Sequence, residues 1–131
     1  MRKLTLITAF VFSLSMFSST SFADWTEASE SVDGDTYFVD FERIRKHGGY
    51  VYFWMLGDYL KPTETGILSD KVYLQGDCEL FRFKFLSFSF HKEPMGGGTG
   101  EIDNKPDKDW TYPTPNSVDE FILKTVCAYA N

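Results

Sequence analysis

Residues 79–91, ELFRFKFLSFSFH, alternate apolar and polar side chains with unusual regularity. From Phe81 to Phe85 every second residue is phenylalanine, whereas from Leu86 to Phe90 the apolar residues occupy the opposite parity. An alternating pattern predicts a β-strand with one buried face, and a one-residue shift within it predicts a β-bulge. A sharp bend between two short strands would give the same pattern.

Further strands are expected around this segment. The candidates are residues 25–31, 36–41, 50–60 and 69–75, with WTY at 110–112 as a shorter one. Residues 50–60, YVYFWMLGDYL, are apolar on both faces, which predicts a central strand. Gly and Asp favour turns, so turns are expected at residues 33–35 and 76–77, and the other connections at 43–49, 61–66 and 92–116.

The last segment predicts a helix. Ser117 followed by Glu120 forms a capping box. An apolar stripe at helical spacing is expected to pack on the sheet; it comprises Val118, Phe121, Ile122, Thr125, Val126 and Tyr129. Cys127 lies off the edge of this stripe, where it could reach Cys78.

The N-terminus predicts a cleaved signal peptide over residues 1–23. Arg2 and Lys3 precede an apolar run, and Ser21 and Ala23 occupy the positions that a signal peptidase reads, so Asp24 is the expected first residue. The alternative is a retained anchor, but the apolar run of about 14 residues is shorter than the ~20 needed to span a bilayer. No cysteine lies at the cleavage point, so a lipid anchor is not expected there. Residues 24–131 form the single expected domain.

Two cysteines, Cys78 and Cys127, follow the signal peptide and are therefore expected in an oxidising compartment. A structural disulfide between them would remove roughly 4 kcal/mol of unfolded-chain entropy in the loop-closure description. The alternative is a reactive cysteine, which needs a basic neighbour to lower its pKa. Asp77 and Glu79 flank Cys78 and would raise its pKa instead.

Residues 24–131 are acidic, with 11 basic and 19 acidic residues and a formal net charge of −8. Nucleic acids and anionic membranes require a basic face, so neither is an expected partner. The net charge favours contact with basic patches of a partner, weakened by salt.

The glycine-rich segment MGGGTG, residues 95–100, suggests a phosphate cradle at first sight. However, a P-loop requires lysine after its last glycine, and Glu101 stands there instead. We therefore expect no nucleotide and interpret the segment as a structural or protein-contact loop.

No metal site, cofactor or enzymatic activity is expected. His47 and His91 lack zinc-binding neighbours, and no nucleophile-elbow motif is present. Two alternatives remain open: a hydrolytic carboxylate pair, and a calcium site at the aspartates of residues 33–35 or 103–109, which do not match the EF-hand order.

Candidate protein-binding residues are Met95 of the glycine-rich segment and Trp110 and Tyr112 of WTYPTP, residues 110–115. Aromatic side chains on a stiff loop are typical contact anchors. The alternative is that Trp110 and Tyr112 cover a sheet edge or the helix.

Four segments together resemble the bacterial surface-adhesin protein E-like domain: VYFWMLGDY, LSDKVYLQGDC, FHKEPMGGGTG and WTYPTPNSVDEFILKTVC. The resemblance covers most of residues 25–128. It implies an α+β fold with an antiparallel sheet of about six strands, one packed C-terminal helix, and a disulfide between Cys78 and Cys127.

The same resemblance implies an exported, non-enzymatic, adhesin-like binding module at the outer-membrane surface. Host extracellular-matrix proteins such as vitronectin and laminin are the implied partners, and a homodimer is implied as well. The family's host-binding segment is basic, whereas this chain is acidic and lacks a lipid-modified cysteine. These departures favour an alternative, a periplasmic protein that binds a bacterial partner in an envelope-stress or inhibitor role.

Overall fold

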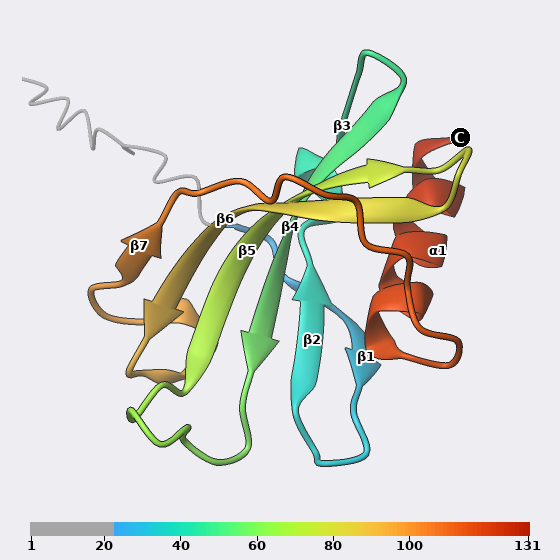
Figure 1. Ribbon diagram of the computed structural model, residues 1–131. Coiled ribbons are helices and arrows are strands. Elements are labelled where there is room, and N and C mark those ends of the chain that lie inside the picture. The colour runs from blue at the N-terminus through green and yellow to red at the C-terminus, as the bar shows by residue number, and fades with distance from the viewer. Residues whose placement is uncertain (1–22) are drawn as a thin grey trace, which may run out of the picture.

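Residues 23–131, described by a computed structural model, form a seven-stranded antiparallel sheet and one α-helix (Figure 1). The strand order is β1-β2-β4-β5-β6-β7, and β3 pairs with β4. The elements are β1 (Thr26–Glu30), β2 (Thr36–Val39), β3 (Arg45–His47), β4 (Tyr50–Asp58), β5 (Ser69–Asp77), β6 (Arg82–His91), β7 (Glu101–Asp103) and α1 (Val118–Ala130), with short 3₁₀ turns η1 (Phe41–Arg43) and η2 (Pro94–Gly96). The expected fold class is confirmed. The expected signal peptide lies outside the described residues except for Ala23.

β4 is a central strand, as its two apolar faces predict. It pairs with β2 and β3 along one edge and with β5 along the other. Val51, Phe53 and Met55 point toward α1 and are buried. The alternate residues of β4 point to the opposite face, where most of them are half-buried.

The bulge predicted in residues 79–91 is confirmed. Tyr73 of β5 pairs with Ser87, but the next residue, Leu74, pairs with Phe85, so Leu86 is the extra residue. Because of this extra residue, the phenylalanines on both sides of the bulge reach the same face of the sheet. Their rings form a chain of contacts with centroid distances of 5.2, 5.1 and 5.6 Å, through Phe83, Phe85, Phe88 and Phe90.

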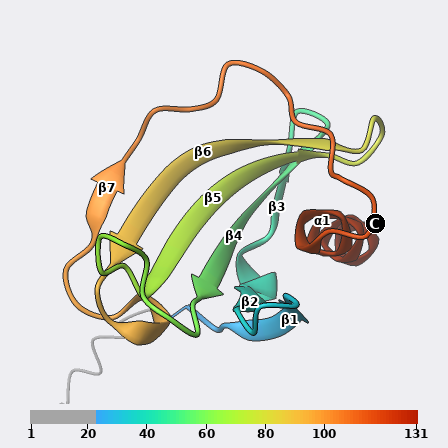
Figure 2. The ribbon, with the colours of Figure 1, turned by 60° about the horizontal axis from the view of Figure 1, so that its bottom comes forward.

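α1 lies inside the curve of the sheet, under one end of the long strands (Figure 2). The capping box is confirmed: the Glu120 amide donates to Ser117 Oγ at 3.1 Å, and Glu120 Oε1 accepts from the Asn116 amide at 3.2 Å. At 13 residues, α1 does not meet the length of a bilayer span, and neither does any other helix between residues 23 and 131.

The predicted apolar stripe of the helix is wrong at its edges. Phe121 and Tyr129 are exposed, whereas Leu123 and Cys127 are buried beside Ile122 and Val126. The disulfide attaches Cys127 to the turn after β5, so the face of the helix that carries the cysteine lies against the sheet. Cys127 therefore lies within the stripe rather than off its edge.

The turn predicted at Gly76-Asp77 is also wrong, because both residues end β5 and the chain turns over residues 78–81. A Cβ atom at position 76 would lie 2.8 Å from Val51 Cγ2 and 3.0 Å from Leu123 Cδ1. Gly76 thus allows the helix to approach the sheet closely. Glycine is needed at this position because of packing, not because the chain turns there.

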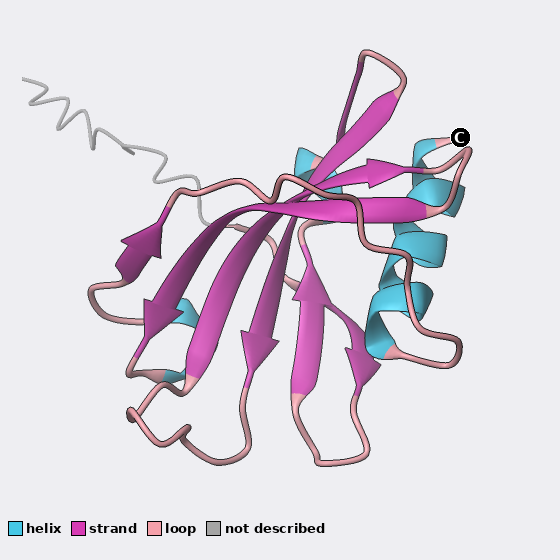
Figure 3. Ribbon diagram, viewed as in Figure 1, coloured by secondary structure: helices cyan, strands magenta, loops and turns pink. Residues whose placement is uncertain are grey.

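Two short strands, β3 and β7, were not predicted, and the strand predicted at residues 110–112 forms only an isolated bridge. β3 lies in the expected connection 43–49, and β7 lies in the expected connection 92–116 (Figure 3). WTY at 110–112 contributes one isolated bridge, between Thr111 and Phe83. Together with Asp107, whose amide donates to the Phe85 carbonyl, this bridge pairs the outer edge of β6 where β7 does not reach.

Candidate binding surface

The face of the sheet opposite α1, called the open face below, carries a row of half-buried aromatic side chains. They are Tyr50, Tyr52 and Trp54 of β4, Tyr73 of β5, and Trp110 from the segment that follows β7. The ring centroids of Trp54 and Tyr73 are 4.8 Å apart, and those of Tyr50 and Trp110 are 5.3 Å apart. Such rings combine a large apolar area with polar edges, as protein-contact surfaces require.

Basic side chains border this aromatic row. Cross-strand pairing places four of them on the open face, and η1 adds one near its end; they are Arg45, Lys71, Arg82, Lys84 and Arg43. Burial and the neighbouring Tyr52 raise the pKa of Tyr73, and Arg45, which pairs with Tyr52 across β3 and β4, acts to lower it. Five of the 11 basic residues after residue 23 are thus gathered around one face of an acidic chain.

Trp110 lies where the aromatic row and the basic residues meet. The Arg82 guanidinium carbon is 4.3 Å from the centroid of the Trp110 ring, and Lys84 Nζ is 4.8 Å from it. Both are cation–π distances. The bridge between Thr111 and Phe83 holds the backbone next to Trp110 against β6, so the indole is in a defined position.

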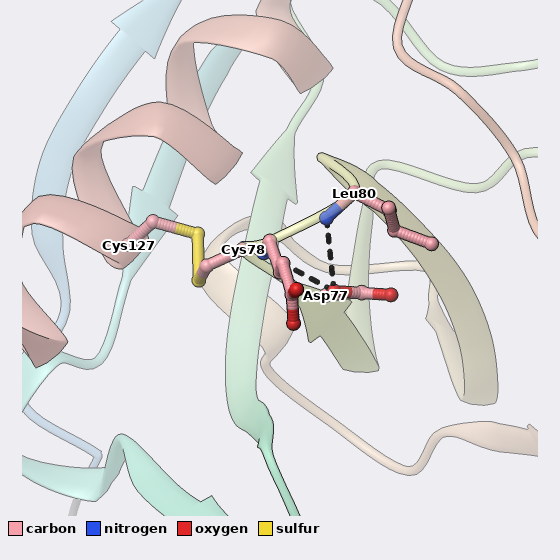
Figure 4. The surroundings of a disulfide bond; sticks show 5 residues. Asp77, Cys78, Leu80 and Cys127 are labelled. Atoms are coloured by element: carbon pink, nitrogen blue, oxygen red, sulfur yellow. Dashed lines mark hydrogen bonds between the residues drawn. A yellow bond between two sulfur atoms is a disulfide. The ribbon is translucent and has the colours of Figure 1, made fainter.

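Asp77 supports this arrangement from the end of β5, beside the disulfide (Figure 4). Its carboxylate accepts from Arg82 Nε at 2.9 Å and from the amides of Glu79 and Leu80. Desolvation acts to raise the pKa of Asp77, but the bonds from the Leu80 amide, Arg82 and the Glu79 amide lower it below its usual value. Asp77 therefore stays charged and holds Arg82 under Trp110.

The sequence-predicted residues Met95, Trp110 and Tyr112 fall at two ends of the open face. Tyr112 is 62% exposed, and it lies close enough to Arg82 to act on the pKa of the guanidinium. Partial desolvation acts to lower the pKa of Arg82, whereas the hydrogen bonds to Asp77 and Tyr112 raise it overall. Met95, which is 42% exposed, lies in η2 at the other end of the aromatic row.

Met95 borders a cleft of about 560 Å³, called the tryptophan cleft below. Its lining residues are Trp25, Arg43, Trp54, Lys71, Met95 and Gly96, together with Ala23, which the expected cleavage before Asp24 would remove. Arg43 forms an ion pair with Asp40, the residue that follows β2, and Arg43 Nε lies 3.3 Å from Asp40 Oδ2. Asp40 is only 1% exposed, and within residues 23–131 neither of its carboxylate oxygens has a hydrogen-bond partner, so the contact with Arg43 offsets its buried charge.

The glycine-rich segment packs against the sheet. The Gly96 amide donates to Ser69 Oγ at 2.8 Å, and His91 Nδ1 lies 3.1 Å from the Gly97 carbonyl oxygen. A Cβ at Gly100 would clash with Ser89 and His91. The glycines are required for this close approach, which gives the segment a structural part in shaping the tryptophan cleft.

The carboxylates named as alternatives serve the backbone. Asp35 accepts from the Leu60 amide, Asp103 from the Lys105 amide, and Asp107 from the Phe85 amide. Within residues 23–131, no group of three or more histidine, cysteine, aspartate or glutamate side chains is placed to hold a metal ion. Burial raises the pKa of Asp70, against the lowering effect of hydrogen bonds from Tyr59 and Gly57.

Both cysteines are used in the disulfide. Cys78 and Cys127 have a Cα–Cα distance of 5.7 Å and are bonded (Figure 4), so no free cysteine is present in the described chain. The bond attaches the C-terminal part of α1 to the turn between β5 and β6.

The cluster of basic residues was missed by sequence reasoning. Its members come from η1, β3, β5 and β6, as two close pairs, Arg43 with Arg45 and Arg82 with Lys84, and the single residue Lys71. One signal was present: Arg82 and Lys84 alternate with phenylalanines in residues 79–91 and must therefore share the face opposite to them.

Comparison with known proteins agrees with this architecture. Residues 25–128 match the family described as Surface-adhesin protein E. The fold is similar to crystal form II of Haemophilus influenzae protein E, at 19% identity and a TM-score of 0.63, over 84% of this chain and 92% of that chain. A second structure of Haemophilus influenzae protein E, also 19% identical, gives a TM-score of 0.60 over 82% of this chain and 86% of that chain.

Protein E from non-typeable Haemophilus influenzae gives a TM-score of 0.57 at 19% identity, over 82% of this chain and 77% of that chain. A search of curated proteins gives no significant match. At this identity the solved structures establish the common fold. The family match spans nearly all of the described residues, and the chain therefore belongs to the surface-adhesin protein E family.

Proposed function

We propose that this protein is an exported, non-enzymatic adhesin-type module that binds a protein partner through its open face. The observation that carries the proposal is the tilted ring contact between Trp110 and Tyr50, with Arg82 and Lys84 against the indole. Trp, Tyr and Arg are the residue types that dominate binding energy at protein interfaces. Family membership supports the same general role.

The charge of the open face changes the expected partner. The net charge of −8 favoured a basic partner, but electrostatic interactions between exposed charges fade beyond a Debye length of about 8 Å at physiological salt. Within that range the open face presents Arg45, Lys71 and Lys84, and also Arg82, whose charge is balanced by Asp77. The partner surface is therefore expected to be acidic, and binding is expected to weaken as salt rises.

Host extracellular-matrix proteins are the proposed partners, and immobilised vitronectin and laminin are the direct test. Binding of the exported protein at micromolar concentration and low salt is expected. Lys84→Gln and Trp110→Ala should each reduce it, whereas Lys124→Gln, the same charge change on exposed α1, should not. Absence of binding to both matrix proteins would contradict the proposed partners, and equal loss in the Lys124 variant would contradict the proposed surface.

Proteinase K treatment of intact and permeabilised cells tests the location. Digestion in intact cells supports a surface adhesin. Protection until permeabilisation favours the alternative function, a periplasmic module with a bacterial partner, and a pull-down from periplasm then replaces the matrix assay.

Light scattering of the purified protein reports whether it forms the proposed homodimer.

A further inference from the structure

We propose that the tryptophan cleft binds an acidic segment of the partner protein. The cleft anchors one carboxylate side chain of that segment together with the apolar side chain beside it. The inference rests on the proposed function and assigns a ligand chemistry to one end of the open face. Its occupant is a segment of another polypeptide, recognised by two cations held between two indoles and a thioether.

Each cation of the cleft has a contact within the domain that restricts its side chain. Arg43 is paired through Nε with the buried carboxylate of Asp40, while its side chain remains 38% exposed. Lys71 is covered differently: the end of its aliphatic stem lies against the backbone of Gly96, where the absence of a side chain leaves room for it. Both residues line the cleft, and ordering them before binding reduces the entropy lost when a ligand arrives.

The apolar walls are equally constrained. Trp54 is in tilted ring contact with Tyr73 in the aromatic row, and Trp25 precedes β1. Met95 has φ 56° and ψ 34°, a left-handed conformation that a non-glycine residue adopts only at some free-energy cost. Its amide donates to Asp58 Oδ1 at 2.8 Å, which holds this conformation and keeps the methionine at the rim of the cleft.

The combination favours a carboxylate with an apolar neighbour. An arginine and a lysine attract an anion, and the surrounding indole and thioether surface strengthens that attraction by displacing water. A sulfated polysaccharide would require cations spaced along its length, whereas here one arginine and one lysine line a single cleft together with two indoles and a thioether. An acidic peptide segment that contains an aromatic or aliphatic residue matches both the charge and the walls.

The test uses two amidated peptides, acetyl-Phe-Glu-Leu-Glu-Phe-amide and its glutamine counterpart, titrated into the exported protein labelled with ¹⁵N. The indole N–H signals of Trp25 and Trp54, assigned by tryptophan-to-phenylalanine substitutions, report on the cleft, and that of Trp110 reports on the other end of the open face. The glutamate peptide is expected to shift the cleft signals, and the glutamine peptide to bind about tenfold more weakly.

Three variants separate the contributions. Lys71→Met keeps the stem and removes the charge, and it should weaken binding of the glutamate peptide about tenfold. Asp40→Asn combined with Arg43→Gln removes the other cation without leaving a buried charge unpaired, and the same loss is expected. Met95→Gly should weaken binding while leaving the melting temperature unchanged or higher, because glycine relieves the left-handed strain. Lys124→Met is the matched charge control and should bind as the wild type does.

Equal affinity for the two peptides, or an unchanged affinity in both cation-removing proteins, would overturn the inference. So would binding of a sulfated hexasaccharide at the cleft signals when the glutamate peptide leaves them unmoved. Lys71→Met and the double variant could bind immobilised matrix protein like the wild type while the glutamate peptide does not bind the wild-type cleft. In that case the cleft inference is wrong and the proposed function stands. If matrix binding is absent but the peptide result holds, the proposed partners fall instead.

Discussion

The two faces of the sheet are built from alternate residues of the same strands, but they differ in what covers them. On the helix side, Val51, Phe53 and Met55 are buried under or beside α1. On the open face, Tyr52 and Trp54 are only half-buried, and basic residues surround them. The helix side contributes most of the buried core that stabilises the domain. The open face keeps an aromatic surface that a partner can cover. This division predicts different consequences for substitutions at adjacent positions.

The largest expected effect compares two neighbouring residues of β4. Phe53→Ala should lower the free energy of unfolding by about 3–5 kcal/mol, because it leaves a cavity in the closed core. Trp54→Ala should lower it by only about 1–2 kcal/mol, through the lost contact with Tyr73. Urea denaturation of both variants measures the difference. Equal losses would mean that the open face is a second core, and the division between the faces would be broken.

The disulfide closes the helix side, so its removal is the next largest effect. Cys78→Ala combined with Cys127→Ala should lower the free energy of unfolding by about 4 kcal/mol in the chain-entropy description. Chemical denaturation against the wild type, with and without reductant, gives the value. A loss below about 1 kcal/mol would show that packing of α1, rather than the covalent bond, holds the helix on the sheet.

Asp77 connects the two faces, and its contribution depends on pH. Its pKa is lowered in the folded state, so it stabilises the fold above the usual aspartate pKa of about 3.9 and loses this effect as pH falls below that value. Asp77→Asn should lower the free energy of unfolding by about 1–3 kcal/mol at pH 7. The difference from the wild type should shrink on acidification, and a constant difference from pH 7 to pH 3 would contradict the role of the charge.

The smallest effect concerns a charge on the apolar side. Asp119 lies beside Phe53 and Leu123, and burial raises its pKa. An acid with a raised pKa favours folding at pH below its unfolded value and loses that benefit as pH rises. Asp119→Asn should therefore stabilise the protein by about 0.5 kcal/mol at pH 7 and have little effect at pH 3. Thermal melts at both pH values measure this, and destabilisation at pH 7 would show that the helix dipole outweighs burial.

Most of the fold was predictable from local patterns. The alternation in residues 79–91 predicted β6 and its bulge, and Ser117 with Glu120 predicted the start of α1. The errors arose where a distant contact overrides the local preference. Gly76 was assigned to a turn because glycine is common there, yet its actual constraint is the approach of Leu123 from α1.

The candidate site was only partly predictable. Trp110, Tyr112 and Met95 were recognised individually from their loops, but their division between two ends of one face was not. β3 and β7 are three residues each and have exposed side chains. They therefore lack the buried alternation by which a strand is recognised in sequence.

The sequence by itself determined the secondary structure of the long elements, because alternation, capping and helical spacing depend on neighbours in the chain. Only the tertiary structure decided which charges lie together. Arg43, Lys71 and Lys84 are separated in the sequence, and the register of β4, β5 and β6 brings them to one face beside the tryptophans. A one-residue change of register would send every side chain of a strand to the other face, so this basic, aromatic surface depends on pairings that no local pattern encodes.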